Sequence, residues 1–178
     1  MYPFIRMAWQ VFKHRKAEPL ALTGTHFSRH VCLPWDIDLW KELNNGRTLT
    51  IYDLGRIPLA IRTGLAATLR VNGWGLTVAG ASVRYRRRVR MFETVEMRSR
   101  AICWDARFIY IEQSMWRASG DCANHILYRS AITGANGIVA PAQAIQAMGG
   151  DGQSPTVPGW VAAWIKADAQ RPWPPMQD

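Results

Sequence analysis

The order of apolar and polar positions along the chain predicts one strand followed by one long helix. The segment from Thr25 to Leu33, THFSRHVCL, reads as a β-strand that Pro34 closes. Further along, apolar residues recur at three- and four-residue steps, at Leu54, Ile57, Ile61, Leu65 and Leu69. This stripe predicts an amphipathic helix, and Asn72 and Gly73 provide a stop signal for it.

The position of a proline leaves the start of this helix open. Pro58 lies inside the apolar stripe, and proline is tolerated only in the first turn of a helix or at a kink. The helix therefore begins near Arg56, or it begins earlier and bends.

Four strand-like segments follow Gly75. They read LTVAGASVRYRRRV, TVEMRSRAICW, RFIYIEQSMWRA and ANHILYRSAIT. The connections at 104–107 and 118–122 are short and contain turn-forming residues, which indicates an antiparallel meander. A short helix is predicted from Pro141, then a linker, GDGQSPTVPG, and a final amphipathic helix, GWVAAWIKADAQ.

This order of elements predicts an α+β architecture. One strand, one long helix and four antiparallel strands are expected when a sheet wraps around a single central helix, which is the hotdog fold. We expect an N-terminal segment at 1–20, the hotdog domain at 21–149, and a C-terminal helix with a Pro-rich tail at 150–178.

Composition narrows the class of protein. With 178 residues, 48% hydrophobic and 20% charged, the chain can bury one sizeable core. The three cysteines, Cys32, Cys103 and Cys122, lack metal-type or redox-type spacing, so neither a metal site nor a disulfide is expected. Apolar runs fall short of the roughly 20 residues of a membrane span, which predicts a cytoplasmic protein.

The N-terminal segment is amphipathic and basic. Phe4, Ile5, Trp9 and Phe12 stand at near-helical spacing and precede the run KHRK at 13–16. Such a helix can lie on an anionic membrane surface. It can equally pack on its own domain or on a partner subunit, and we expect this second arrangement.

The formal net charge of +9 favours polyanionic partners, and the arginines concentrate in SVRYRRRVRMFE. On a strand, Arg84, Arg86, Arg88 and Arg90 would share one face and Arg87 would lie on the other. The strip is either a solvated face or a phosphate-binding surface. Nucleic acid is not expected, because few exposed aromatic residues accompany the strip and no recognition motif occurs elsewhere.

The run from Arg29 to Arg56 resembles the opening motif of hotdog proteins of the 4-hydroxybenzoyl-CoA thioesterase type. That motif is a strand, an aspartate, a turn that normally closes in histidine, an Asn-Asn pair and a helix. One group of this family shares further motifs, which appear here as DID, NNGR, LGR, YRRRVR and CWDAR. The likeness runs from about Thr25 to Gly149.

The resemblance implies an acyl-CoA thioesterase that acts on a fatty or aromatic acyl-CoA without a cofactor or metal. Asp38 falls on the catalytic aspartate, and Asp53 lies near a second acid of some relatives. The implied substrate-binding residues are Asn44, Asn45, Gly46, Arg86 and Arg88. Because hotdog active sites usually lie at a subunit boundary, the resemblance also implies a homodimer or homotetramer.

Each of these residues also has a structural interpretation. Asp38 can cap a turn, the asparagines can form one, and Asp53 can favour a helix start. Glu42 replaces the usual histidine, and we expect a turn residue paired with Lys41 or Arg47. Its negative charge would oppose a developing oxyanion, so the alternative function is a non-catalytic hotdog protein that binds acyl-CoA or acyl chains.

Two further residues with reactive side chains are expected to be structural. Cys103 lies in the strand-like segment AICWDARFIYI and is predicted to be a buried, unreactive thiol. His125 alternates with Ile126 in a predicted strand and has no obvious partner in the sequence.

Overall fold

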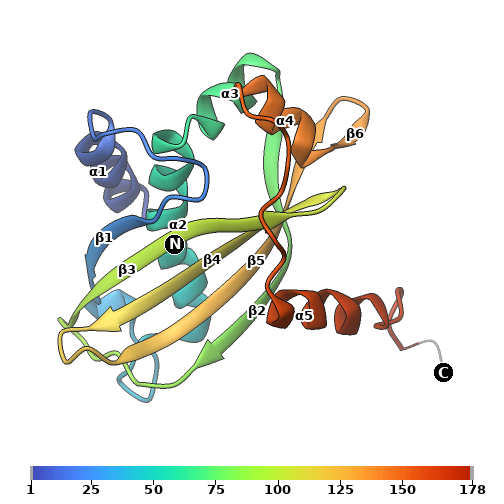
Figure 1. The fold of residues 1–178 in the computed structure, drawn as a ribbon. Coiled ribbons are helices and arrows are strands. Elements are labelled where there is room, and N and C mark those ends of the chain that lie inside the picture. The colour runs from blue at the N-terminus through green and yellow to red at the C-terminus, as the bar shows by residue number, and fades with distance from the viewer. Residues whose placement is uncertain (1, 177–178) are drawn as a thin grey trace.

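The structure, a computed structural model, describes residues 2–176 and shows an antiparallel sheet that curls around one long helix (Figure 1). The elements are α1 (Phe4–His14), β1 (His26–Val31), the 3₁₀ turn η1 (Pro34–Asp36), α2 (Asn45–Arg62), α3 (Leu65–Val71), β2 (Gly75–Tyr85), β3 (Thr94–Trp104), β4 (Phe108–Arg117), β5 (Cys122–Gly134), β6 (Gly137–Val139), α4 (Pro141–Ala147) and α5 (Gly159–Ala169). The predicted hotdog architecture is confirmed.

The sheet has six strands, five of them in the order β1-β3-β4-β5-β2. The predicted meander is confirmed for β3, β4 and β5, which follow one another through short turns. β2 lies on the far side of β5, with Val83 opposite Ile126, and forms one edge of the sheet. β1 pairs with β3 at the other edge, and β6 extends the end of β5.

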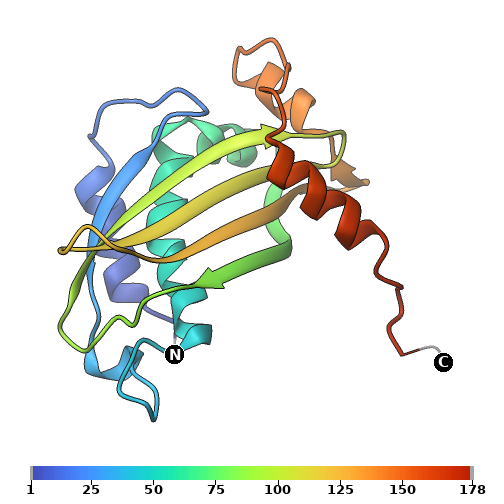
Figure 2. The same ribbon diagram turned by 60° about the horizontal axis from the view of Figure 1, so that its bottom comes forward.

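The central helix is α2, which lies against the concave face of the sheet (Figure 2). It begins at Asn45, earlier than Arg56, and continues through the buried Pro58. The single helix predicted as far as Asn72 is wrong. The chain breaks at Gly64, whose φ of +83° interrupts the helix, and resumes as α3. A left-handed residue cannot continue a right-handed helix, and glycine adopts that conformation without steric cost.

The core fills the space between α2 and the sheet. Tyr52 and Leu54 of α2 are fully buried, as are Met97 and Ile126 of the facing strands. At Gly55 the helix backbone comes so close to the sheet that a Cβ there would lie 2.7 Å from Ser99 Oγ and closer still to Met97 Sδ. Only glycine allows this approach, which sets the distance between helix and sheet.

The terminal helices pack on the outside of this unit. α1 lies beside α2, and α5 crosses the convex face of the sheet, as both views show (Figures 1 and 2). Val161 of α5 is fully buried against the sheet, and Asp168 holds Arg129 of β5 in a 2.6 Å ion pair. Within residues 2–176, no helix is long and apolar enough to cross a membrane.

Candidate active site

The loop between β1 and α2 is fixed by the first aspartate of the DID motif. Asp36 is fully buried, and its Oδ2 accepts hydrogen bonds from the Leu33 N–H (3.0 Å) and from Arg6 Nη1 (2.6 Å). Its Oδ1 accepts from Arg47 Nε at 2.9 Å. A buried carboxylate is stable only when it is paired in this way, so Asp36 joins α1 and α2 to the loop.

Asp38, the second aspartate, lies at the start of a tight hairpin that Ile37 and Leu43 close as a β-bridge. Its N–H donates to the Glu42 carbonyl at 2.9 Å, and its Oδ1 accepts from the Trp40 N–H at 2.9 Å. Asp38 therefore has the turn-capping contacts expected of its structural interpretation, and it lies directly across the hairpin from Glu42.

The start of α2 offers two unengaged backbone donors. Asn44 is the N-cap, and its Oδ1 accepts from the Arg47 N–H at 3.0 Å. The Asn44 carbonyl accepts from the Thr48 N–H at 2.8 Å. In the part of the chain that the structure describes, no hydrogen bond engages the N–H groups of Asn45 and Gly46. The helix dipole adds partial positive charge here, so the helix start can bind an anion.

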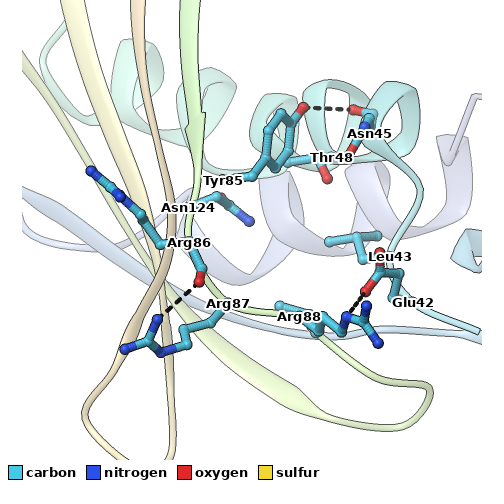
Figure 3. A pocket seen from close by; sticks show the side chains of 10 residues that line it. Glu42, Leu43, Asn45, Thr48, Tyr85, Arg86, Arg87, Arg88 and Asn124 are labelled. Atoms are coloured by element: carbon cyan, nitrogen blue, oxygen red, sulfur yellow. Dashed lines mark hydrogen bonds and ion pairs between the residues drawn. The ribbon is translucent and has the colours of Figure 1, made fainter.

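A shallow hollow of about 180 Å³ adjoins this helix start (Figure 3). It is lined by Glu42, Leu43, Asn45, Thr48, Tyr85, Arg86, Arg87, Arg88, Val89 and Asn124. The Tyr85 hydroxyl donates to the Asn45 carbonyl at 3.2 Å and so ties the end of β2 to the first turn of α2. The hollow thus combines a helix start with a group of cations.

The arginine run differs from its predicted arrangement. β2 ends at Tyr85, and the N–H groups of Arg86 and Arg87 both donate to the Ala123 carbonyl, at 2.8 and 3.0 Å. Because two successive donors share one acceptor, the chain leaves the strand ladder and strand alternation stops. The predicted separation of Arg87 from Arg86 and Arg88 on opposite faces is therefore wrong, and all three line the hollow.

Glu42, in place of the usual histidine, is paired in the hollow. Arg88 Nε lies 2.9 Å from Glu42 Oε2, and Figure 3 shows the two side chains facing each other. The predicted partners of Glu42 were Lys41 and Arg47, but its ion pair is with Arg88. Arg47 pairs with Asp36 instead. The Arg88 side chain is 74% exposed, so solvent screens this ion pair and its contribution to folding is small.

Asp53 lies two turns further along α2 and does not line the hollow. Its carboxylate forms an ion pair with Arg56, whose guanidinium lies 4.2 Å from the centre of the Tyr128 ring. Burial raises the pKa of Asp53, with the neighbouring Arg56 acting against that rise. The structure thus places Asp53 apart from Asn45, Arg86 and Arg88, which lie together.

The remaining reactive side chains lie outside this hollow. Cys103 is fully buried, as predicted, and burial raises its pKa to about 11, which keeps the thiol protonated. His125 has the partner that the sequence did not reveal: its Nε2 lies 2.9 Å from Glu112 Oε1 on β4. This hydrogen bond lowers the pKa of Glu112. Among the described residues, no cluster of three His, Cys, Asp or Glu side chains could hold a metal ion.

The polar residues of this region that the sequence does not indicate include Asp36, Thr48, Tyr85 and Asn124. Thr48 is one helical turn beyond Asn44, a spacing that can be read from the sequence. Asn124 reaches the hollow from β5, and its Oδ1 accepts from the buried Tyr52 hydroxyl. That contact joins α2 to β5 across a separation of 72 residues and depends on how the helix packs on the sheet, so sequence spacing contains no signal for it.

An antiparallel sheet that curls around one long helix defines the hotdog fold. The chain belongs to the thioesterase-like superfamily, whose family model matches residues 32–165. It is also similar to Protein THEM6 of Xenopus laevis, with 34% identity over 167 residues that cover 92% of this chain and 78% of the frog protein. Two other proteins of that name match over 58% and 39% of their length.

Solved structures show the same fold. The probable thioesterase YbaW of Escherichia coli superposes with a TM-score of 0.64 at 12% identity, covering 69% of this chain and 98% of that protein. The protein SAV2348 of Staphylococcus aureus, solved in complex with CoA, has a TM-score of 0.63 at 9% identity, covering 79% and 92%. At these identities the likeness extends to the fold alone.

Proposed function

We propose that this protein is an acyl-CoA thioesterase that hydrolyses a fatty or aromatic acyl-CoA to the free acid and CoA. The observation that carries the proposal is the pair of unengaged N–H groups, of Asn45 and Gly46, at the start of α2. Membership of the thioesterase-like superfamily supports the same reaction class.

The reaction requires stabilisation of negative charge on the thioester oxygen. Water adds to the carbonyl carbon, the oxygen becomes an oxyanion, and collapse of this intermediate breaks the C–S bond and releases the CoA thiol after proton transfer. Backbone donors at a helix start stabilise an oxyanion without a dedicated side chain. Asn45 and Gly46 fill this role in the proposal, and Asn44 maintains the first turn by capping Arg47.

Asp38 is the proposed base or nucleophile. A carboxylate in this position can take a proton from the attacking water or attack the carbonyl carbon directly. Its Oδ1 is engaged by the Trp40 N–H at 2.9 Å, and it lies beside Glu42, which lines the hollow. Asp53 remains a candidate second acid, although its ion pair with Arg56 makes a structural role the better supported one.

The arginines are the proposed site for the phosphates of CoA. Arg86, Arg87 and Arg88 are exposed and line one hollow. Their three positive charges outnumber the one negative charge of Glu42, so the hollow is positively charged. Guanidinium groups bind phosphate oxygens in a bidentate manner, which suits a nucleotide with several phosphates. That SAV2348 was solved with CoA supports a ligand of this type for the fold.

A second copy of the chain is the proposed cover for the open side of the site. Leu39 and Trp40 at the hairpin tip are 92% and 74% exposed, which is unusual for large apolar residues beside a reaction site. β2 is a long edge strand that pairs only with β5 among the described strands. Such edges are normally paired or covered, which supports a homodimer or homotetramer. A cytoplasmic location also remains a prediction.

The test is release of CoA thiol from a panel of short, long and aromatic acyl-CoAs. Wild type should turn over at least one member, and Asp38→Ala should lower turnover at least about 100-fold without loss of folding. Asp151→Ala is the matched control, because Asp151 also accepts a backbone N–H two residues ahead, from Gln153, in an exposed loop. Its turnover should equal that of wild type.

The same panel tests the alternative function, binding without catalysis. Glu42 favours this alternative, because it places a carboxylate in the hollow, where negative charge would oppose an oxyanion. If acyl-CoA still binds but no member of the panel is hydrolysed, the function is non-catalytic binding of acyl-CoA and not thioester hydrolysis. Equal turnover of wild type and Asp38→Ala would remove Asp38 from the mechanism.

A further inference from the structure

α1 packs on the protein mainly through polar side chains, which is unusual for a helix that only covers a core. The side chains that it turns inward include Arg6, paired with Asp36; Gln10, which is 6% exposed; and His14, whose ring lies 4.6 Å from that of His26. Met7 is the main apolar residue of α1 that contacts the core. A helix that served only to cover the core would turn its apolar stripe inward.

The outward face of α1 is apolar. Phe4, Ile5, Trp9 and Phe12 are 71%, 88%, 59% and 55% exposed. On a helical projection, Ile5 and Phe12 lie at the centre of this face, opposite Met7 and His14. Single exposed apolar residues are common, but a contiguous apolar stripe on a surface helix marks an interaction site.

Aromatic and basic groups are combined on this face. The rings of Trp9 and Phe12 stack at 6.0 Å, and the Arg15 guanidinium lies 4.3 Å from the centre of the Phe12 ring. Lys13 and Lys16 are also exposed at the same end. The first acidic residue is Glu18, so every charged side chain that precedes it is basic.

We propose that the outward face of α1, formed by Phe4, Ile5, Trp9, Phe12, Lys13, Arg15 and Lys16, docks on an anionic lipid membrane surface. The helix lies flat in the interface, with its aromatic residues among the headgroups and upper acyl chains and its basic end against lipid phosphates. Both views place α1 at the periphery of the molecule, beside α2 and outside the sheet (Figures 1 and 2).

Charge favours lipid over a second copy of the chain. A symmetric contact between two copies of this face would bring two cationic segments together and supply no carboxylate to either. An anionic bilayer supplies negative charge over its whole surface, and each basic residue near it adds to the attraction. Tryptophan suits an interface that is apolar on one side and wet on the other, and phenylalanine is common on the apolar face of such helices.

Co-sedimentation of the full chain with lipid vesicles tests the proposal. The probes are vesicles of phosphatidylcholine alone and of phosphatidylcholine with about one third phosphatidylglycerol, at 0.1 M salt. Wild type should bind the anionic vesicles at least about 10-fold more tightly than the neutral ones, because several cations face the surface. The triple variant Ile5→Ser/Trp9→Ser/Phe12→Ser should lose binding by at least about 10-fold, since large apolar side chains leave the interface.

Two further variants complete the design. Lys13→Gln/Arg15→Gln/Lys16→Gln keeps the apolar face and should lose the preference for anionic lipid. Val71→Ser/Trp173→Ser is the matched control, because these residues are 80% and 87% exposed on other parts of the molecule, and it should bind as wild type does. Light scattering should show one unchanged oligomeric state for all variants.

Three results would overturn the proposal. They are failure of wild type to bind anionic vesicles, equal binding by the apolar-face variant, and a smaller oligomer for that variant, which would assign the face to a second copy. Thiol release from a soluble acyl-CoA should be unchanged in all variants, so the outcome is independent of the proposed activity.

Discussion

The Arg88 guanidinium lies 2.9 Å from the Glu42 carboxylate, at the hollow beside the start of α2. In the proposed mechanism, this pair places a cation next to a carboxylate that would otherwise oppose negative charge on the thioester oxygen. The acid at this position thus has its own counter-charge.

The first prediction is that removal of Arg88 lowers turnover and that removal of the Glu42 charge restores it. Arg88→Ala should lower turnover roughly 10-fold, because the uncompensated charge of Glu42 then acts on the oxyanion. Adding Glu42→Gln to Arg88→Ala should restore most of the loss, as thiol-release rates would show. Additive losses in the double variant would mean that Arg88 acts on CoA alone.

A second prediction concerns salt. If Arg86, Arg87 and Arg88 bind CoA phosphates, the KM for acyl-CoA should rise as salt increases from 0.1 to about 0.5 M, because the Debye length shortens. Replacing all three with glutamine should raise the KM at low salt and flatten its salt dependence. Arg70→Gln, on the exposed end of α3, is the control and should behave as wild type. A salt-independent KM in wild type would place the phosphates elsewhere.

Gly55→Ala should destabilise the protein, although the same change in an exposed helix is stabilising. The added Cβ would lie 2.7 Å from Ser99 Oγ in a closely packed core, and overpacking of this kind costs about 1–3 kcal/mol. Urea unfolding measures the change in the free energy of unfolding. Gly159→Ala at the start of α5, where a Cβ meets nothing within 4 Å, should be neutral or slightly stabilising. Equal effects of the two changes would contradict the close approach of α2.

The stability of the protein should fall as the pH drops below neutrality. Burial lowers the pKa of His26 to about 4 and that of His30 to about 3. Between these values and the unfolded value near 6.5, the unfolded chain binds more protons, so the free energy of unfolding decreases as the pH falls. The loss is roughly 3 kcal/mol for each histidine by pH 4, with a plateau above pH 7.

Urea midpoints at pH 7.5, 6.0 and 5.0 check this expectation before most carboxylates titrate. His30 donates to or accepts from Ser28 Oγ at 2.8 Å, so His30→Gln retains a polar partner while it removes the titrating group. This variant should show a shallower decline than wild type. A flat profile in wild type between pH 7.5 and 5.0 would mean that the histidines become protonated in the folded state without cost.

The sequence was sufficient for the fold because local patterns and the required topology agree. The alternation in β3 and the apolar stripe of α2 follow the periods of strand and helix, and the short turns between β3, β4 and β5 leave little choice of connection. The break at Gly64 escaped prediction because the apolar stripe continues across it to Leu69. A glycine inside a helical pattern shows no sign of whether it will adopt a positive φ.

The site was predicted only in part, and the reasons are physical. Asn45, Arg86 and Arg88 come together because the helix start and the end of β2 are neighbours in this topology. Which of Asp36 and Asp38 is buried depends on η1, a turn that spacing does not reveal. The distribution of the arginines depends on one carbonyl, that of Ala123, accepting two N–H groups.

Asp36 connects α1 directly to the first turn of α2. One oxygen of this carboxylate accepts from Arg6 on α1 and the other from Arg47 in the first turn of α2. The helix proposed to dock on a membrane and the helix start proposed to hold the oxyanion thus share a single counter-ion. Movement of α1 away from the domain would withdraw one of its two cations and unbalance the charge at the base of the loop that carries Asp38.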